Sequence, residues 1–185
     1  MNRLSMIVDK AVSMVRHLWL DASDARRILP SDMLQRLAQD VASSETRHSG
    51  QIRIYVEASL PMSYLWRLGP TTSMRHLARQ RAVMQFSKLR VWDTERNSGV
   101  LIYLLLAEHA IEIVADRGVS LHVTDAQWQA IVTQMGSTFA QRRFEEGLTD
   151  ALHEVSELLI RHFPATSALN ALGHGNELPD EPFIG

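Results

Sequence analysis

The most apolar stretch of the chain, Val100 to Ala107, lies between two polar turns that are rich in carboxylates. An unbroken apolar run that follows Asn-Ser-Gly predicts a strand covered on both faces. The next three residues, 108–110, are short enough for a hairpin loop. A second strand is therefore expected to return antiparallel over residues 111–115.

The residues before this hairpin predict a helix, a strand and a second helix. Apolar residues at helical spacing indicate a helix that begins with Ser31 as N-cap and ends near Ser44. Residues 51–59 alternate between apolar and polar side chains, which predicts a half-buried strand. A basic helix is expected over residues 73–88. Together with the central strand these elements make a βαβ unit, whose two strands should be parallel.

The residues after the hairpin predict mainly helix. Apolar alternation over 119–123 indicates a short fourth strand. Helices are expected over 124–139, where Thr124 and Gln127 fit a capping box, and over 142–162. The predicted fold class is α/β, with a small mixed β-sheet of three to four strands, a βαβ unit plus a hairpin, sandwiched between helices.

The pattern divides the chain into three parts. Residues 1–30 are expected to form an N-terminal amphipathic helical extension, whose helix over 6–19 docks on the domain, faces a partner or lies on a membrane surface. Residues 31–164 form the α/β domain. Residues 165–185 form a flexible C-terminal tail, which its apolar residues 183–184 can tie down.

The composition of the chain excludes several kinds of site and several classes of function. The chain has no cysteine, which excludes disulfides, thiolate metal sites and cysteine nucleophiles. A formal net charge of -2 provides no basic field to attract nucleic acid. No segment reaches the roughly 18–20 apolar residues that cross a bilayer, so no transmembrane segment is expected. These features favour a soluble domain in the cytoplasm.

Polar residues from three separate segments are expected to meet at one edge of the sheet, where the parallel strands begin and the antiparallel strand ends. Their carboxylate and amide oxygens are ligands that Ca2+ or Mg2+ takes in proteins. The predicted metal ligands are Asp93, Glu95, Asn97 and Asp116. In the alternative interpretation, Asp93 makes an Asx turn and residues 97–99 are only a turn.

Three further residues at this edge, Arg117, His48 and Glu45, are candidate contacts for a phosphate or a protein partner. Glu45 and His48 have the spacing of two ligands on one helical face, and a cap or local salt bridge is the alternative. Phosphate ester hydrolysis would need a bound metal and a positive group for the developing charge. The sequence has no P-loop, zinc-hydrolase or serine-hydrolase motif, so no catalytic residue is assigned and no organic cofactor is expected.

The segment NSGVLIYLLLAEHAIEIVADRGV, residues 97–119, resembles the central signature of the TPM domain family. Residues 124–128, 144–148 and 162–164 match later helix boundaries of that family, so the resemblance covers residues 31–164. It implies an α/β sandwich around a small sheet, in a soluble bacterial-type member. It also implies a divided function, because some members are reported to bind calcium and others have been credited with acid phosphatase activity.

The predicted function is therefore a divalent-metal-binding interaction or regulatory module, whose partner is a protein of unknown identity, membrane-associated or not. The alternative is a weak metal-dependent acid phosphatase that acts on phosphate monoesters, and the sequence leaves open whether the chain is an enzyme.

Overall fold

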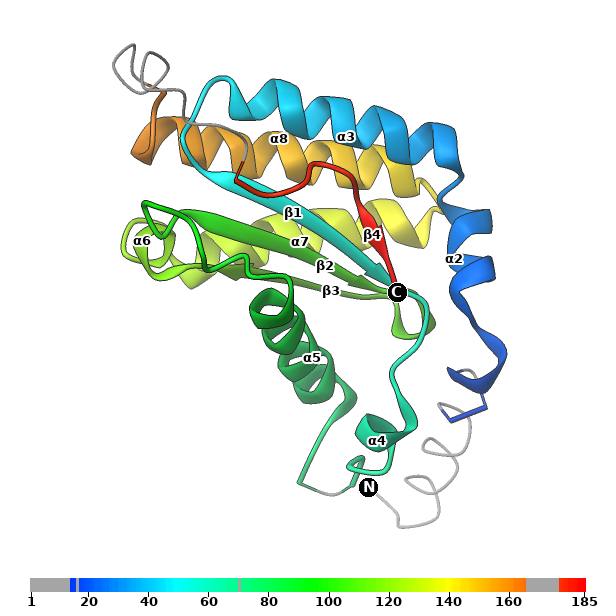
Figure 1. Ribbon diagram of the computed structural model, residues 1–185. Coiled ribbons are helices and arrows are strands. Elements are labelled where there is room, and N and C mark those ends of the chain that lie inside the picture. Colours follow the sequence, from blue (N-terminus) through cyan, green and yellow to red (C-terminus); the bar gives the residue numbers. More distant parts are fainter. Residues whose placement is uncertain (1–13, 16, 70, 166–176) are drawn as a thin grey trace.

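The computed structural model describes residues 14–15, 17–69, 71–165 and 177–185 (Figure 1). A four-stranded mixed sheet with the order β3-β2-β1-β4 forms its centre. The strands are β1 (Gln51–Glu57), β2 (Gly99–Leu105), β3 (Ala110–Ala115) and β4 (Phe183–Ile184). β1 is parallel to β2 and β4, whereas β3 is antiparallel to β2. The predicted parallel pair and the hairpin, which turns through the 3-10 helix η1 (Leu106–Glu108), are thus confirmed.

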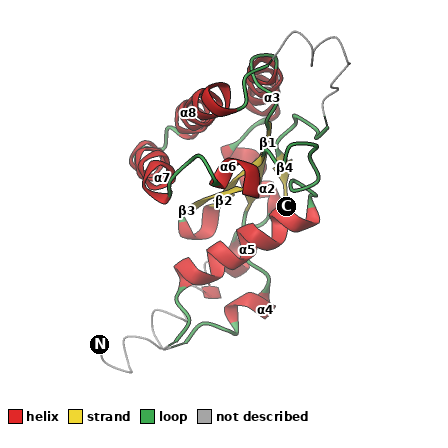
Figure 2. Ribbon diagram, turned by 90° about the vertical axis from the view of Figure 1, so that its left-hand side faces the viewer, coloured by secondary structure: helices red, strands yellow, loops and turns green. Residues whose placement is uncertain are grey.

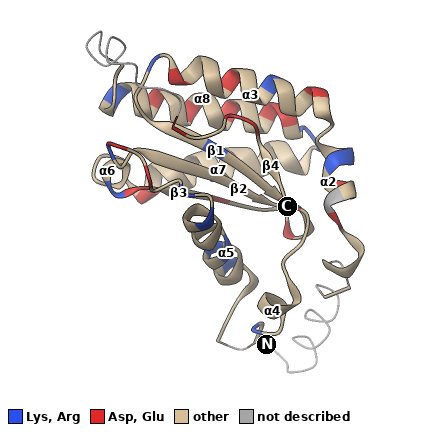
Figure 3. Cartoon of the chain, viewed as in Figure 1, with Lys and Arg blue, Asp and Glu red and all other residues tan. Residues whose placement is uncertain are grey.

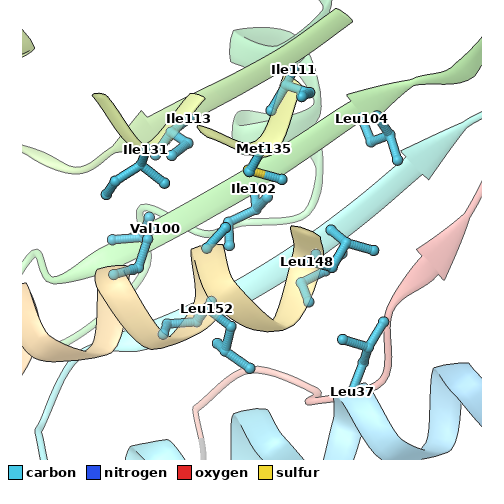
Figure 4. Close-up of a cluster of buried hydrophobic side chains, with 14 of the residues drawn as sticks. Leu37, Val100, Ile102, Leu104, Ile111, Ile113, Ile131, Met135, Leu148 and Leu152 are labelled. Atoms are coloured by element: carbon cyan, nitrogen blue, oxygen red, sulfur yellow. The ribbon is translucent and has the colours of Figure 1, made fainter. Parts of the chain in front are cut away.

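Helices cover one face of the sheet. They are α2 (Ala22–Ile28), α3 (Ser31–Glu45), α7 (Asp125–Ala140) and α8 (Phe144–His162). Figures 1 and 2 show α3, α8 and α7 side by side in one layer. Their apolar faces share the main core with the sheet, where Met135 lies beside Ile102 of β2, and Leu148 and Leu37 continue the cluster toward β4 (Figure 4).

The opposite face is covered by α5 (Met74–Lys88), which follows the short helix α4 (Met62–Leu65). Leu77 and Ala82 of α5 share a second core cluster with Leu101 and Tyr103 of β2. Basic positions are spread along α5 (Figure 3). Because helices bury both faces of the sheet, the predicted sandwich is confirmed.

β1 is buried along its whole length, so the prediction of a half-buried strand is wrong. Ile52 and Ile54 lie in the main core, while Tyr55 lies in the second cluster. The polar residues on the Tyr55 side, Arg53 and Glu57, are only 7% and 3% exposed. The alternation in the sequence therefore separates an apolar environment from a hydrogen-bonded one, and not the interior from solvent.

Residues 119–123 are not a strand, because the helix α6 (Arg117–Ser120) occupies this region. The amide of Val123 donates to the carbonyl oxygen of Val119 at 3.0 Å, which is the spacing of one helical turn. Both valines are buried, whereas Leu121 is 83% exposed. The fourth strand is β4 instead, and its pairing with β1 confirms that residues 183–184 tie down the tail.

Side-chain caps mark the starts of some helices but not of α3. The N-cap of α3 is Pro30, and not Ser31 as predicted, and no side chain caps this helix. The capping box of Thr124 and Gln127 at α7 is confirmed. α2 lies within the predicted helical extension, although its bounds were not predicted, and Asp21 opens it with a complete capping box.

The N-terminal extension is described only in part, and most of the predicted helix over 6–19 lies outside the described residues. Ala25 and Leu29 are fully buried in the main core, so α2 packs on the domain. Among the helices that the structure describes, none has the length and apolar character needed to cross a membrane.

Candidate functional site at the edge where the strands begin

Three turns meet at the edge of the sheet where β1 and β2 begin and β3 ends. In the strand register, Gln51 pairs with Gly99, and Val100 pairs with Ala115. The hydroxyl of Ser98 donates to the carbonyl oxygen of Ser49 at 3.2 Å, which joins the first two turns. The segments that sequence analysis assigned to this edge therefore do come together through the backbone.

The turn that precedes β2 is held by Thr94, which is not among the predicted metal ligands. The amide of Ser98 donates to Thr94 Oγ1 at 2.9 Å, and the amide of Asn97 donates to the Thr94 carbonyl oxygen at 3.1 Å. Asn97 adopts the left-handed conformation with φ of 53°. Asp93 instead forms a surface ion pair with Arg90. The turn is thus built by a buried threonine and not by Asp93.

Asp116 sits where β3 ends and α6 begins. Its Oδ1 accepts the amide hydrogen of Arg117 at 2.7 Å, which makes Asp116 the N-cap of α6. The residue is 6% exposed, and its Oδ2 is buried without a hydrogen-bond partner. Such an oxygen is uncommon, because buried polar groups are nearly always paired with protein, water or an ion.

Backbone oxygens of the neighbouring turn lie close to the start of α6. The amide of Gly118 donates to the carbonyl oxygen of Asn97 at 3.0 Å. A Cβ atom at Gly118 would lie 2.6 Å from that oxygen and 2.7 Å from the carbonyl oxygen of Arg96, so only glycine allows this approach. Arg117 reaches the side-chain oxygen of Asn97 with its Nη2 at 3.5 Å. The start of α6 therefore brings the buried carboxylate of Asp116, backbone oxygens of the neighbouring turn and the guanidinium of Arg117 close together.

Glu45 has a local structural role at this edge. Its Oε1 accepts the amide hydrogen of Ile52 at 2.8 Å. Burial raises the pKa of Glu45 to about 8, and the nearby carboxylates of Asp180 and Glu177 also raise it. This contact matches the local alternative for Glu45, since the carboxylate caps the first residues of β1.

His48 is 2% exposed and lies before β1. Its Nδ1 is 3.0 Å from the carbonyl oxygen of Gly50, which identifies Nδ1 as the protonated nitrogen, and its Nε2 is buried without a partner. Burial lowers the pKa of His48 to about 4, so the ring is neutral at pH 7. In this tautomer Nε2 carries no hydrogen to donate, and a contact of His48 with a phosphate or a partner stays a prediction.

The four predicted metal ligands do not form a cage of carboxylates. Across the described part of the chain, no group of three or more histidine, aspartate and glutamate side chains is arranged to hold a metal ion. Asp93 is paired with Arg90, and of the four predicted ligands, all of which the structure describes, only Asp116 has a buried oxygen without a hydrogen-bond partner. Metal binding at this edge stays a prediction, and its geometry now centres on Asp116.

The tail adds a residue to this edge that no sequence pattern indicated. Glu177 Oε2 accepts the amide hydrogen of Glu95 at 3.0 Å, so the tail touches the turn that precedes β2. Gln51 Oε1 accepts the amide hydrogens of Glu177 and Leu178, each at 3.0 Å. The tail is therefore part of the structure of the candidate site.

Polar residues at the opposite edge are paired with one another. Glu57 binds the guanidinium of Arg81 and accepts the hydroxyl hydrogen of Tyr103 at 2.7 Å. His17 and Glu108 form another pair at 3.1 Å. Ligands of parallel sheets usually bind at the carboxyl ends of the strands. Here Glu57 and Glu108, which lie at those ends, already bind other side chains of the protein.

Comparison with known proteins identifies a family and a fold. The family model described as TPM domain matches residues 22–158. No curated protein matches the chain. Among solved structures, the NMR structure of the BA42 protein from the psychrophilic bacterium Bizionia argentinensis is similar, with 23% identity and a TM-score of 0.67. The match covers 85% of this chain and 95% of BA42, so the two proteins share a fold.

Proposed function

The chain belongs to the TPM domain family, and from that premise we propose that it is a divalent-cation-binding module that uses the edge around Asp116. Asp116 would supply the charged ligand, and the oxygens of the Arg96–Asn97 turn would supply neutral ones. Ca2+ and Mg2+ are the candidate ions, because both take oxygen ligands.

The observation that carries this proposal is the buried Oδ2 of Asp116. A carboxylate oxygen shielded from water and lacking a hydrogen bond is unfavourable unless a cation or a donor compensates it. The other oxygen of the carboxylate already accepts the Arg117 amide. A hard cation would compensate the charge of Oδ2 without disturbing that cap.

The ligand set predicts weak binding. Affinity for Ca2+ rises with the number of charged ligands and the rigidity of the site, and sites with few charges have dissociation constants on the order of 10⁻⁴–10⁻³ M. A single buried carboxylate with neutral oxygens belongs at this weak end. The guanidinium of Arg117 lowers the affinity further, since it lies 3.5 Å from the Asn97 oxygen.

The test compares the wild-type chain with Asp116→Asn and Asp125→Asn in thermal unfolding. Asparagine at 116 keeps an oxygen for the Arg117 amide but removes the charge, while Asp125 lies in the first turn of α7 and controls for charge alone. At ten times the dissociation constant, a ligand specific for the folded state adds about 1.4 kcal/mol. For a chain of this size that raises the Tm by about 3–6 °C.

Calcium or magnesium should raise the Tm of the wild type and of Asp125→Asn, but not of Asp116→Asn, at matched ionic strength. An equal rise in all three chains, or no rise in any, would refute cation binding at Asp116.

Hydrolysis of phosphate monoesters is the alternative use of the same edge, since Arg117 stands beside Asp116. Two of the predicted phosphate contacts already have structural surroundings, because Glu45 accepts the Ile52 amide hydrogen and His48 is buried. We therefore favour binding over catalysis. Turnover of a generic phosphate monoester that requires a divalent ion and is lost in Asp116→Asn would favour the alternative.

A further inference from the structure

The outer side of β1 is a strand edge that the chain covers with its own residues 177–185, which we call the terminal segment. β4 within this segment pairs with β1 in parallel, Phe183 opposite Tyr55 and Ile184 opposite Val56 (Figure 1). Uncovered strand edges readily accept another extended segment, including one from a second chain. The nature of the contacts decides how such a segment would be recognised.

Two side chains of β1 bind the main chain of the terminal segment. Gln51 accepts the amide hydrogens of Glu177 and Leu178. Arg53 donates to the carbonyl oxygens of Pro179 and Glu181, the latter at 2.9 Å. The strand therefore binds the segment as it would bind an extended peptide, through the amides that precede Pro179 and the carbonyl oxygens of Pro179 and Glu181.

Further contacts fix the direction and register of the segment. Phe183 stacks on Tyr55 with ring centroids 5.3 Å apart, and Tyr55 stacks in turn on Tyr103. The amide of Gly185 donates to the Val56 carbonyl oxygen at 3.0 Å. A Cβ atom at Gly185 would lie 2.0 Å from the Tyr55 hydroxyl oxygen, so a larger residue at this position would have to displace the stacked Tyr55 ring.

We propose that this edge slot, formed by Gln51, Arg53, Tyr55 and Val56, binds the terminal segment of a second copy of the chain, so that two copies exchange their terminal segments. None of the contacts just described requires both partners to belong to one chain. A terminal segment from a second copy would restore the same hydrogen bonds and the same ring stack. Exchange of identical elements is a low-cost route to a dimer, and added strands are a common mode of peptide recognition.

The first test uses a labelled peptide with the sequence of residues 177–185 and the full-length chain. In the wild type, the tethered segment competes at high effective concentration, so the peptide should bind weakly. The substitutions Phe183→Ala and Gly185→Pro remove the ring stack and the amide that bonds Val56. This segment-defective chain should bind the peptide at least tenfold more tightly than the wild type.

A peptide that ends in Phe-Ile-Ala is the matched control, because its additional methyl group meets the Tyr55 hydroxyl. It should bind at least tenfold more weakly than the native peptide. Equal binding of the two peptides, or no binding of the native peptide to a folded segment-defective chain, would overturn the proposal that the edge slot recognises this segment.

The second test asks whether the natural occupant comes from a second copy. A slot-defective chain, Arg53→Met, keeps its terminal segment but loses the donor to Pro179 and Glu181. Mixed with the segment-defective chain, it should form a one-to-one dimer in analytical ultracentrifugation, whereas each chain alone stays monomeric. Peptide binding without formation of this mixed dimer would overturn exchange between copies.

Folding of each variant is checked by circular dichroism and cooperative melting. Methionine preserves most of the aliphatic volume of the buried Arg53. If Arg53→Met does not fold, Gln51→Leu replaces it, because it removes the acceptor for the Glu177 and Leu178 amides while the arginine stays in place.

Discussion

Replacing Arg81 with methionine should destabilise the protein strongly, because it leaves Glu57 charged and buried. Arg81 Nε lies 3.0 Å and 2.9 Å from the two carboxylate oxygens of Glu57. The side chains of Arg81 and Glu57 are only 13% and 4% exposed. Removing one partner of a buried ion pair typically costs about 3–5 kcal/mol. For a chain of this length that corresponds to a fall in Tm of about 6–20 °C.

The double variant Glu57→Gln/Arg81→Met separates two effects: the loss of the contact between the two side chains, and the burial of a carboxylate without a partner. Glutamine is neutral and can still accept the hydrogen bond from Tyr103, so the double variant should be more stable than Arg81→Met alone. The measurement is the free energy of unfolding in urea for the wild type, both single variants and the double variant. Additive effects of the two substitutions would refute the reasoning, because a coupled pair must deviate from additivity.

An exposed ion pair on another helix provides the control. Arg143 and Glu146 are i,i+3 neighbours with side chains 47% and 50% exposed. Pairs of this kind contribute about 0–1 kcal/mol. Arg143→Met should therefore change the free energy of unfolding far less than Arg81→Met, and a comparable loss would show that burial is not the cause.

Three further predictions concern pH and glycine. Because the pKa of Glu45 is raised to about 8, the wild type should lose stability as pH rises from about 4.5 to 8, and Glu45→Gln should flatten this dependence in melting curves across pH. Because the pKa of His48 is lowered to about 4, stability should also fall as pH drops from about 6.5 to 4, and His48→Asn should remove that loss. A Cβ atom at Gly99 would lie 1.9 Å from the Val91 carbonyl oxygen. A Cβ atom at Gly136 would have no neighbouring atom within 4 Å. Urea unfolding should therefore show a loss of about 1–3 kcal/mol or more for Gly99→Ala and a gain of about 0.4–1 kcal/mol for Gly136→Ala.

The hairpin and the long helices could be predicted from sequence because each has a strong local pattern. The apolar run from Val100 and the capping box at Thr124 specify their elements without distant contacts. Residues 119–123 misled the prediction, because two valines four residues apart fit both a strand and a helical turn. β4 has only two residues, so its pairing with β1 depends on distant contacts such as the stack of Phe183 on Tyr55.

The sequence was sufficient to predict which turns meet at the candidate site. It was not sufficient to predict which side chains contact one another there. Topology alone brings Asp116 to the turn that precedes β2, since strand direction fixes which ends meet. The burial of His48 and the hydrogen bond from Glu95 to Glu177 depend on packing between distant segments, which no short-range pattern in the sequence encodes. The exposed pair of Asp93 with Arg90, by contrast, joins residues only three apart.

The position of β4 in the chain has a kinetic consequence. Arg53 and its acceptor at Pro179 are 126 residues apart, so this contact closes one of the longest loops in the protein. Contacts between residues so distant in sequence slow folding, because the entropy of loop closure is lost before the contact can stabilise anything. During synthesis β1 emerges long before β4, and its edge stays open to neighbouring nascent chains in the meantime. An apolar strand from another chain would cover the guanidinium of Arg53 without the carbonyl oxygens that residues 179 and 181 supply, so the arginine disfavours such pairing.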